Sequence, residues 1–261
     1  MALIDFKALF PTITAFVAFI ITLLCLFAGT QKNFLDDADL LTLYTPSTTP
    51  SASASAQETV THDFYSVHIM SYCSGQLGTT DPSAGVTRNV TACSDRTILF
   101  AFDPTQAWPK EATHGAELDW PRVIADDFHA FRMTSRAMAV LYCVGVGVLG
   151  AMLIGRVIGV VKPWGGMGFL EFGGLTFASF SITIASIIAT VLAFEFVALI
   201  NAHGKGSNVS ARYGEKFLGM TWAAVGLLLA GSVASFVNVF IRAPAAPAPA
   251  VEKDLDSDLE G

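Results

Sequence analysis

Four long runs of apolar residues alternate with polar segments along the chain. The runs cover residues 8–29, 137–161, 175–200 and 217–241. Each is close to or above the roughly 20 apolar residues that a helix needs to cross a bilayer. The pattern therefore predicts an all-α membrane protein built as a bundle of four transmembrane helices.

The first run has an alternative interpretation as a cleaved signal peptide, because small residues at Ala28 and Gly29 offer a cleavage point. Its apolar stretch is longer than the roughly 7 to 15 residues of a signal core, and Lys7 before it is balanced by Asp5. We therefore expect a retained membrane anchor.

The composition agrees with a membrane location. Of the 261 residues, 52% are hydrophobic and only 14% are charged, and the mean hydropathy is +0.54. The formal net charge is −7. A chain without a basic surplus is a poor match for a nucleic acid.

Four spans divide the rest of the chain into five segments. These are an N-terminus (1–7), a long first loop (30–136), a short Gly-rich connection (162–174), a second loop (201–216) and an acidic tail (242–261) that we expect to be disordered. Within the first loop, residues 42–61 form a Ser/Thr/Pro/Ala linker. Such a composition buries too little apolar surface to fold, and outside a cell it suits O-glycosylation.

Cysteines and sequons indicate which loops face out of the cell. Cys73 and Cys93 are the two cysteines outside the apolar runs, and a disulfide between them persists only in an oxidising compartment. The N-glycosylation sequons begin at Asn89 and Asn208, in the first and second loops. The numbers of Lys and Arg residues at the span ends favour the opposite orientation. The cysteine pair decides, and we predict cytosolic termini and extracellular loops.

The first loop also contains signals for local structure. Residues 62–69 and 97–102 have the composition of strands, and a Cys73–Cys93 disulfide would join them. Residues 119–136 predict an amphipathic helix that packs on these strands or rests on the membrane surface. We therefore expect a small, disulfide-stapled, β-containing extracellular domain.

Small residues recur at four-residue spacing within the spans. The second span carries Gly147, Ala151, Gly155 and Gly159, where helices in lipid can approach closely. Similar stripes predict contacts in the third and fourth spans: Ser181, Ala185, Ala189 and Ala193, then Gly226, Ala230 and Ala234.

Ionisable residues inside the spans are the candidates for catalysis. Arg156 and Glu195 lie well inside, but in opposite leaflets, so they are not expected to pair. We expect Arg156 to extend to the headgroups, and Glu195 either to do the same, to bond a neighbouring helix or to serve an ion or proton. The five histidines show no metal-binding spacing. The sequence thus predicts no catalytic residues, no metal and no cofactor.

Several motifs together resemble one family. They are four spans, a first loop with Tyr72-Cys73-Ser74-Gly75 followed by Cys93, and a fourth span that contains Met220-Thr221-Trp222-Ala223-Ala224. This combination resembles the fungal Sur-seven/PalI family, a distant relative of the claudins. The claudin pattern has Trp before its cysteines, and this chain does not, which argues against a paracellular role.

The resemblance implies a non-enzymatic organiser of eisosome-type plasma-membrane domains, linked to cell-wall organisation, endocytosis and patch stability. Its expected partners are membrane lipids, other proteins of these domains, the cell wall and further copies of the chain. Two alternatives stay open: a PalI-like subunit for sensing ambient pH, and a claudin-like regulator of calcium influx.

Overall fold

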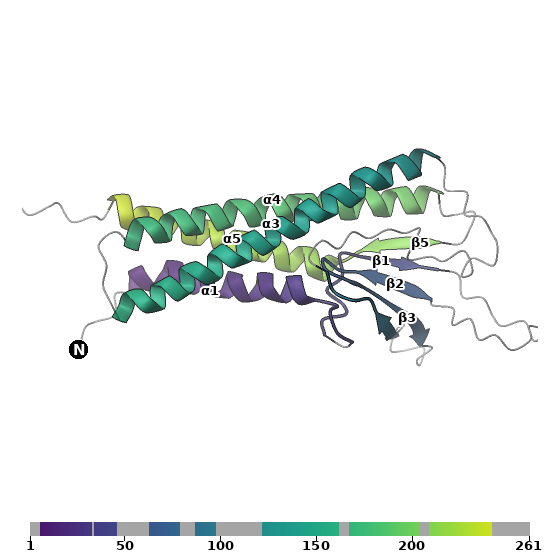
Figure 1. Cartoon of the computed structure of the whole chain (residues 1–261), viewed down its shortest axis with the longest axis horizontal. Coiled ribbons are helices and arrows are strands. Elements are labelled where there is room, and N and C mark those ends of the chain that lie inside the picture. Colours follow the sequence, from purple (N-terminus) through teal and green to yellow (C-terminus); the bar gives the residue numbers. More distant parts are fainter. Residues whose placement is uncertain are drawn as a thin grey trace, which may run out of the picture.

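The computed structural model describes residues 6–32, 34–45, 63–78, 87–97, 122–161, 167–203 and 209–241. Its helices and strands form two connected parts, a bundle and a sheet at one end of it (Figure 1). The helices are α1 (Phe6–Phe27), α3 (Arg122–Val161), α4 (Met167–His203) and α5 (Glu215–Phe236), which continues as the π-helical turn η2 (Val237–Ile241). The strands are β1 (Leu41–Tyr44), β2 (Phe64–Val67), β3 (Tyr72–Gly78), β4 (Thr87–Cys93) and β5 (Ser210–Tyr213).

Four of these helical segments are long and apolar enough to span a membrane. They are Leu9–Phe27, Phe131–Gly159, Gly168–Ala202 and Glu215–Ile241. The start of α1 and the end of η2 lie at the end of the bundle opposite the sheet (Figure 1). The predicted four-helix, multi-pass membrane architecture is confirmed.

The helices α3 and α4 extend further than the sequence predicted. The helix predicted over 119–136 is confirmed from Arg122 on, but it continues without a break into the second span, because α3 runs from Arg122 to Val161. The sequence from Arg122 to Val144 contains neither Gly nor Pro, so nothing ends the helix at the membrane surface.

The Gly-rich connection is likewise shorter than predicted, because Met167–Gly174 forms the first turns of α4. Aromatic packing offsets the weak helix propensity of its glycines. The ring of Phe172 lies 5.8 Å from that of Phe236 and 5.5 Å from that of Phe240. Helix α4 is therefore held to the end of α5 where the sequence predicted a loop.

The five strands form one antiparallel sheet in the order β4-β3-β2-β1-β5. Strand β2 lies inside the strand predicted over 62–69, which is confirmed. The start of the predicted Ser/Thr linker is wrong, because Thr42–Tyr44 belongs to β1, where Leu43 is fully buried. Strand β4, which ends at Cys93, pairs with β3. The strand predicted at 97–102 stays a prediction, because residues 98–102 lie outside the described ranges.

The sheet packs one face against α4. Alternate residues of its strands point to this face, as the two-residue period of a strand requires. The shared core consists of Leu41, Leu43, Tyr65, Val67, Val209 and Ala211 from the sheet and connecting loop, with Phe196 and Ile200 from α4. The bundle and the sheet therefore share a core at the end of α4.

Several predicted features lie outside the described ranges. These are residues 46–61 of the linker, the second sequon at Asn208, residues 1–5, residues 162–166 of the connection and the acidic tail at 242–261.

Candidate functional site

The disulfide joins the edge strand β4 to its neighbour β3. Cys73 of β3 and Cys93 of β4 are directly opposed in the register, and their Cα atoms are 4.0 Å apart. A register shift follows at Ser74 and Gly75. A Cβ atom at Gly75 would lie 2.2 Å from the backbone oxygen of Asn89, so only glycine fits there. The predicted Cys73–Cys93 disulfide is confirmed, and it staples two neighbouring strands.

A tight joint connects the end of α1 to this stapled region. Gly29 has φ = +68°, a conformation that favours glycine. Its carbonyl oxygen accepts a hydrogen bond of 2.9 Å from the Ser71 hydroxyl and lies 3.1 Å from the Cys73 sulfur. The first span is therefore fixed to the β2–β3 turn and the disulfide.

The imidazole of His68 fills the centre of this joint. It is 2% exposed, and its Nδ1 lies 3.2 Å from the Ala38 carbonyl oxygen. Among the described residues, Nε2 has no hydrogen-bond partner. Burial lowers the pKa of His68 to about 4, only partly opposed by the contact with Ala38. His68 is therefore neutral at neutral pH, and a proton added to it would be poorly accommodated.

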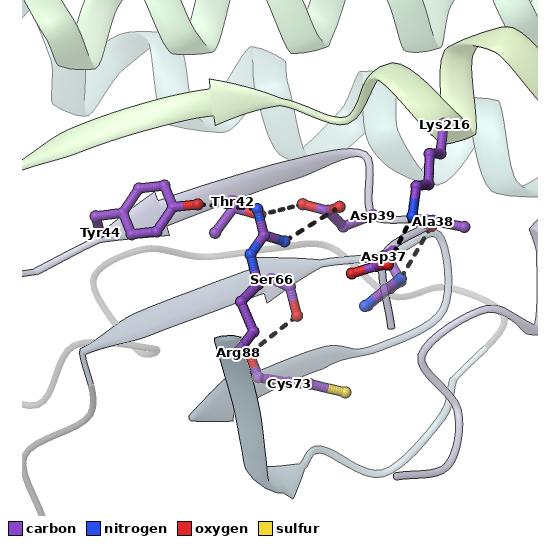
Figure 2. A network of polar contacts seen from close by, with 10 residues as sticks. Asp37, Ala38, Asp39, Thr42, Tyr44, Ser66, Cys73, Arg88 and Lys216 are labelled. Atoms are coloured by element: carbon purple, nitrogen blue, oxygen red, sulfur yellow. Dashed lines mark hydrogen bonds and ion pairs between the residues drawn. The ribbon is translucent and has the colours of Figure 1, made fainter. Parts of the chain in front are cut away.

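A polar network crosses the sheet face that carries the disulfide (Figure 2). The Arg88 guanidinium lies 3.8 Å from the carboxylate of Asp39 and donates a 2.8 Å hydrogen bond to the Tyr44 hydroxyl. It also lies over the rings of Tyr44 and Phe64, at 5.8 and 5.9 Å from their centroids. Arg88 thus links β4 to the loop that precedes β1.

Asp39 is the buried member of this network. It is 4% exposed, and it accepts a hydrogen bond from the Thr42 hydroxyl. Burial raises the pKa of Asp39 against the opposing effects of Thr42 and Arg88. The buried carboxylate is stabilised by two partners, Thr42 and Arg88 (Figure 2).

The same loop fixes the start of α5. The Lys216 ammonium donates a 2.6 Å hydrogen bond to Asp37, which lowers the pKa of that exposed carboxylate. Gly214 donates its N–H to the Leu40 carbonyl oxygen at 3.0 Å. A Cβ atom at Gly214 would overlap the carbonyl group of Asp39. The loop between α1 and β1 therefore touches α5, β2 and β4, and couples the first and fourth spans through the sheet.

A second polar cluster lies at the opposite end of the bundle. Arg156 of α3 forms a 3.0 Å ion pair with Glu171 of α4, and its Nε donates a 3.1 Å hydrogen bond to the Thr12 hydroxyl of α1. Thr12 lies 3.4 Å from the other Glu171 oxygen. Arg156, which the sequence predicted to extend to the headgroups, is therefore bound to side chains of two neighbouring helices. Glu171 was missed because the sequence assigned it to the Gly-rich loop. One signal was available: it is the acidic residue nearest the start of the third span.

Three clefts meet at Arg156. Between α1 and α3 lies a cleft of about 520 Å³, between α3 and α4 one of about 230 Å³, and between α1, α4 and η2 one of about 370 Å³. Arg156 lines all three, and Glu171 lines the latter two. This ion pair is therefore reached from three clefts within the spans.

Glu195 does not join either cluster. Its side chain is exposed on α4. Its neighbour Phe194 packs its ring 4.9 Å from that of Tyr213 in β5, and Phe196 belongs to the core of the sheet. Glu195 thus lies level with the sheet, where α4 has left the middle of the bundle. Arg156 and Glu195 are far apart, as predicted from their positions.

The first sequon is accessible, since Asn89 is exposed on β4. Whether it carries a glycan stays a prediction.

The small-residue stripes have mixed outcomes. In α4, Ser181, Ala185, Ala189 and Ala193 are all buried, as predicted. In α3 the predicted packing face is wrong: Gly147 and Ala151 are exposed, Gly159 is half-buried, and a Cβ atom at Gly147 or Gly155 would meet no described atom within 4 Å. The α5 prediction fails similarly at Gly226 and Ala230, which are both exposed.

Other glycines make the close contacts instead. A Cβ atom at Gly145 of α3 would lie 2.5 Å from Ile182 of α4. At Gly231 of α5, it would lie 2.5 Å from the Thr14 hydroxyl of α1. Hydrogen bonds reinforce these faces, with Tyr142 and Ser186 3.1 Å apart and Ser181 donating to the Leu141 carbonyl oxygen at 2.9 Å.

Comparison with known proteins agrees with this architecture. No curated protein and no solved structure matches the chain. The family model of the SUR7/PalI family matches residues 8–234, from the first span to the end of α5. A match over that much of the chain, together with the four spans and the stapled sheet, shows that this protein belongs to the SUR7/PalI family.

Proposed function

We propose that this protein is a non-enzymatic organiser of eisosome-type domains of the plasma membrane, with roles in cell-wall organisation, endocytosis and patch stability. Membership of the SUR7/PalI family supports a membrane protein of this kind. In this proposal the sheet faces the cell wall, the bundle holds a position in the membrane, and the termini face cytosolic partners. The polar clusters serve structure and not catalysis.

The disulfide supports the proposed orientation. A Cys73–Cys93 bond is maintained outside the cytosol, which favours an extracellular sheet and cytosolic termini. The exposed Asn89 supports this orientation as an acceptor for a glycan. Substituting Asn89→Gln should remove one glycan and so reduce the mobility shift on deglycosylation. When protease is added to intact cells, an epitope tag at the C-terminus should stay uncleaved.

The observation that carries the proposal is the continuity between sheet and bundle. Phe131 of α3 and Phe196 of α4 have ring centroids 4.9 Å apart, and both contact the core of the sheet. The Gly29 joint adds a second connection from α1. The sheet is therefore firmly attached to the spans, which supports the proposed link between wall and membrane.

Imaging tests the proposal directly. A fluorescently tagged chain in its fungal host should form immobile plasma-membrane patches. Phe196→Ala, which removes a ring that is 4% exposed, should weaken the connection and reduce patch retention. Phe177→Ala on the same helix is the control, because that ring is 57% exposed. Uniform surface staining of the unmodified protein would contradict the proposal.

A pH-sensing role is the second candidate, favoured by the buried His68 and Asp39 in the extracellular domain. Burial lowers the pKa of His68 to about 4 and raises that of Asp39. In the folded protein His68 therefore gains its proton near pH 4, and a deletion strain carrying His68→Asn should show altered signalling near pH 4. Unchanged signalling at that pH would remove this candidate.

A further inference from the structure

We propose that the cleft between α1 and α3 binds one phospholipid, with the phosphate at Arg156 and an acyl chain along the apolar part of the cleft. This inference deepens the proposed organiser function and rests on it for its biological use, because a protein that defines a membrane domain needs lipids that stay with it. The binding itself follows from the shape and polarity of the cleft.

The cleft is apolar along most of its length. Its α1 wall carries Ile13, Phe16 and Phe19, and its α3 wall carries Leu153, Ile154 and Val157. The two walls come close together at Gly150, since a Cβ atom there would lie 3.3 Å from the Phe19 ring. A channel of this kind between two helices offers an acyl chain more contact than a single convex helix does.

One end of the cleft is polar and cationic. Thr12 and Arg156 line it, and the Arg156 guanidinium is bound to the Thr12 hydroxyl at 3.1 Å. This hydrogen bond orients the guanidinium at the junction of α1 and α3. A planar guanidinium with several N–H donors is well suited to a phosphate group.

The arrangement of the ion pair favours an approaching phosphate. The Arg156 side chain is 32% exposed, whereas the Glu171 side chain is 10% exposed. Glu171 does not line the α1–α3 cleft. A headgroup that enters this cleft therefore meets the cation first, with the carboxylate behind it.

The depth of Arg156 also suits a phospholipid. It lies five residues before the end of α3 at Val161, about 8 Å along a helix that rises 1.5 Å per residue. A long arginine side chain spans much of that distance toward the headgroup region. A phosphate at the guanidinium would thus leave the acyl chain pointing along α1 and α3 toward the middle of the bilayer.

Retention of lipid by the purified protein tests this inference. The full chain is extracted in mild detergent, exchanged extensively, and mixed with detergent micelles that contain phosphatidylserine and phosphatidylcholine. Native mass spectrometry then counts the phospholipids that stay bound. Ile154→Trp should fill the cleft, and Ile154 is 63% exposed, so the bundle should tolerate the change. Val144→Trp is the matched control, on the same helix at an exposed position outside the cleft.

We expect the unmodified chain and Val144→Trp to retain one phospholipid, and Ile154→Trp to retain at least tenfold less. The double variant Arg156→Gln with Glu171→Gln, which removes the charge without leaving a buried carboxylate alone, should also lose at least tenfold. Excess inorganic phosphate should not displace the lipid, because the acyl chain contributes to binding. Equal retention in all variants, or equal loss in Val144→Trp, would overturn the inference.

The two proposals fail separately. Patches in cells combined with no retained phospholipid would contradict the lipid site and leave the organiser role standing. Retained phospholipid combined with uniform surface staining would do the reverse.

Discussion

Gly29 lies against the imidazole ring of His68, and the two residues fit only because Gly29 has no side chain. A Cβ atom at Gly29 would lie 2.1 Å from Cδ2 of His68, and its φ of +68° would strain any L-residue. The contact joins the end of the first span to the turn after β2, across 39 positions of sequence. The joint between membrane and sheet thus depends on a glycine and a buried histidine together.

Gly29→Ala should therefore destabilise the protein. The left-handed backbone costs about 1 to 2 kcal/mol for a residue with a Cβ atom, and the clash with His68 adds to that cost. Thermal unfolding in detergent should show a clear decrease in melting temperature. Gly147→Ala is the control, since it lies in a helix with no described atom near its Cβ position and should be neutral or slightly stabilising.

His68 should make stability depend on pH. Its pKa of about 4 in the folded protein lies below its ordinary value of 6.5, so the unfolded chain binds a proton first as the pH decreases. Stability should be lost between pH 6.5 and about 4, by roughly 3 kcal/mol in total. Asp39 has a raised pKa and contributes the opposite slope, because its carboxylate is destabilising at neutral pH and becomes protonated in acid.

The variant His68→Asn separates the two effects. It keeps an amide near the Nδ1 position but does not titrate, while Asp39 is unchanged. Melting temperatures measured from pH 7 to pH 4 should decrease less steeply for the variant than for the unmodified chain. Parallel pH profiles would show that His68 is not the group responsible.

Removing the disulfide should cost the sheet much of its stability. Cys73 and Cys93 enclose 19 residues, and closing a loop of that size contributes about 3 kcal/mol in the chain-entropy description. The double variant Cys73→Ser and Cys93→Ser should be more sensitive to protease within the first loop and less abundant at the surface. Normal surface delivery of a protease-resistant double variant would contradict a structural role for the bond.

The sequence was sufficient to predict the spans and the staple because each depends on a local or compositional signal. Long apolar runs indicate spans whatever their neighbours are. Two cysteines outside the apolar runs have few other cysteines with which to form a disulfide. The start of α4 was missed for the opposite reason. It is helical because of tertiary contacts, such as Phe172 with Phe236, that no local pattern records.

The packing faces show the same limit. A four-residue spacing of small residues indicates that a close approach is available, but not that a neighbouring helix uses it. In α3 the glycine that meets α4 is Gly145, two positions before the predicted stripe begins at Gly147. The Arg156–Glu171 pair was missed because it required knowing that α4 begins before Glu171.

The choice of face gives a direct prediction. Gly145→Leu should disrupt the contact between α3 and α4, because even a Cβ atom there lies 2.5 Å from Ile182. Gly147→Leu should leave the fold intact. Monodispersity on gel filtration and melting temperature should separate the two variants, and equal behaviour would contradict the observed orientation of α3.

The ion pair between Arg156 and Glu171 should show strong coupling in a double-mutant cycle. Arg156→Gln leaves the nearly buried Glu171 carboxylate without its cation, which should cost roughly 2 to 4 kcal/mol, less than for a fully buried pair because Arg156 is partly exposed. Glu171→Gln should cost less, since the more exposed guanidinium can turn toward the headgroups. The double variant should be more stable than Arg156→Gln alone, because it removes the isolated carboxylate. Unfolding in detergent measures all three, and additive losses would show that the two side chains do not stabilise each other.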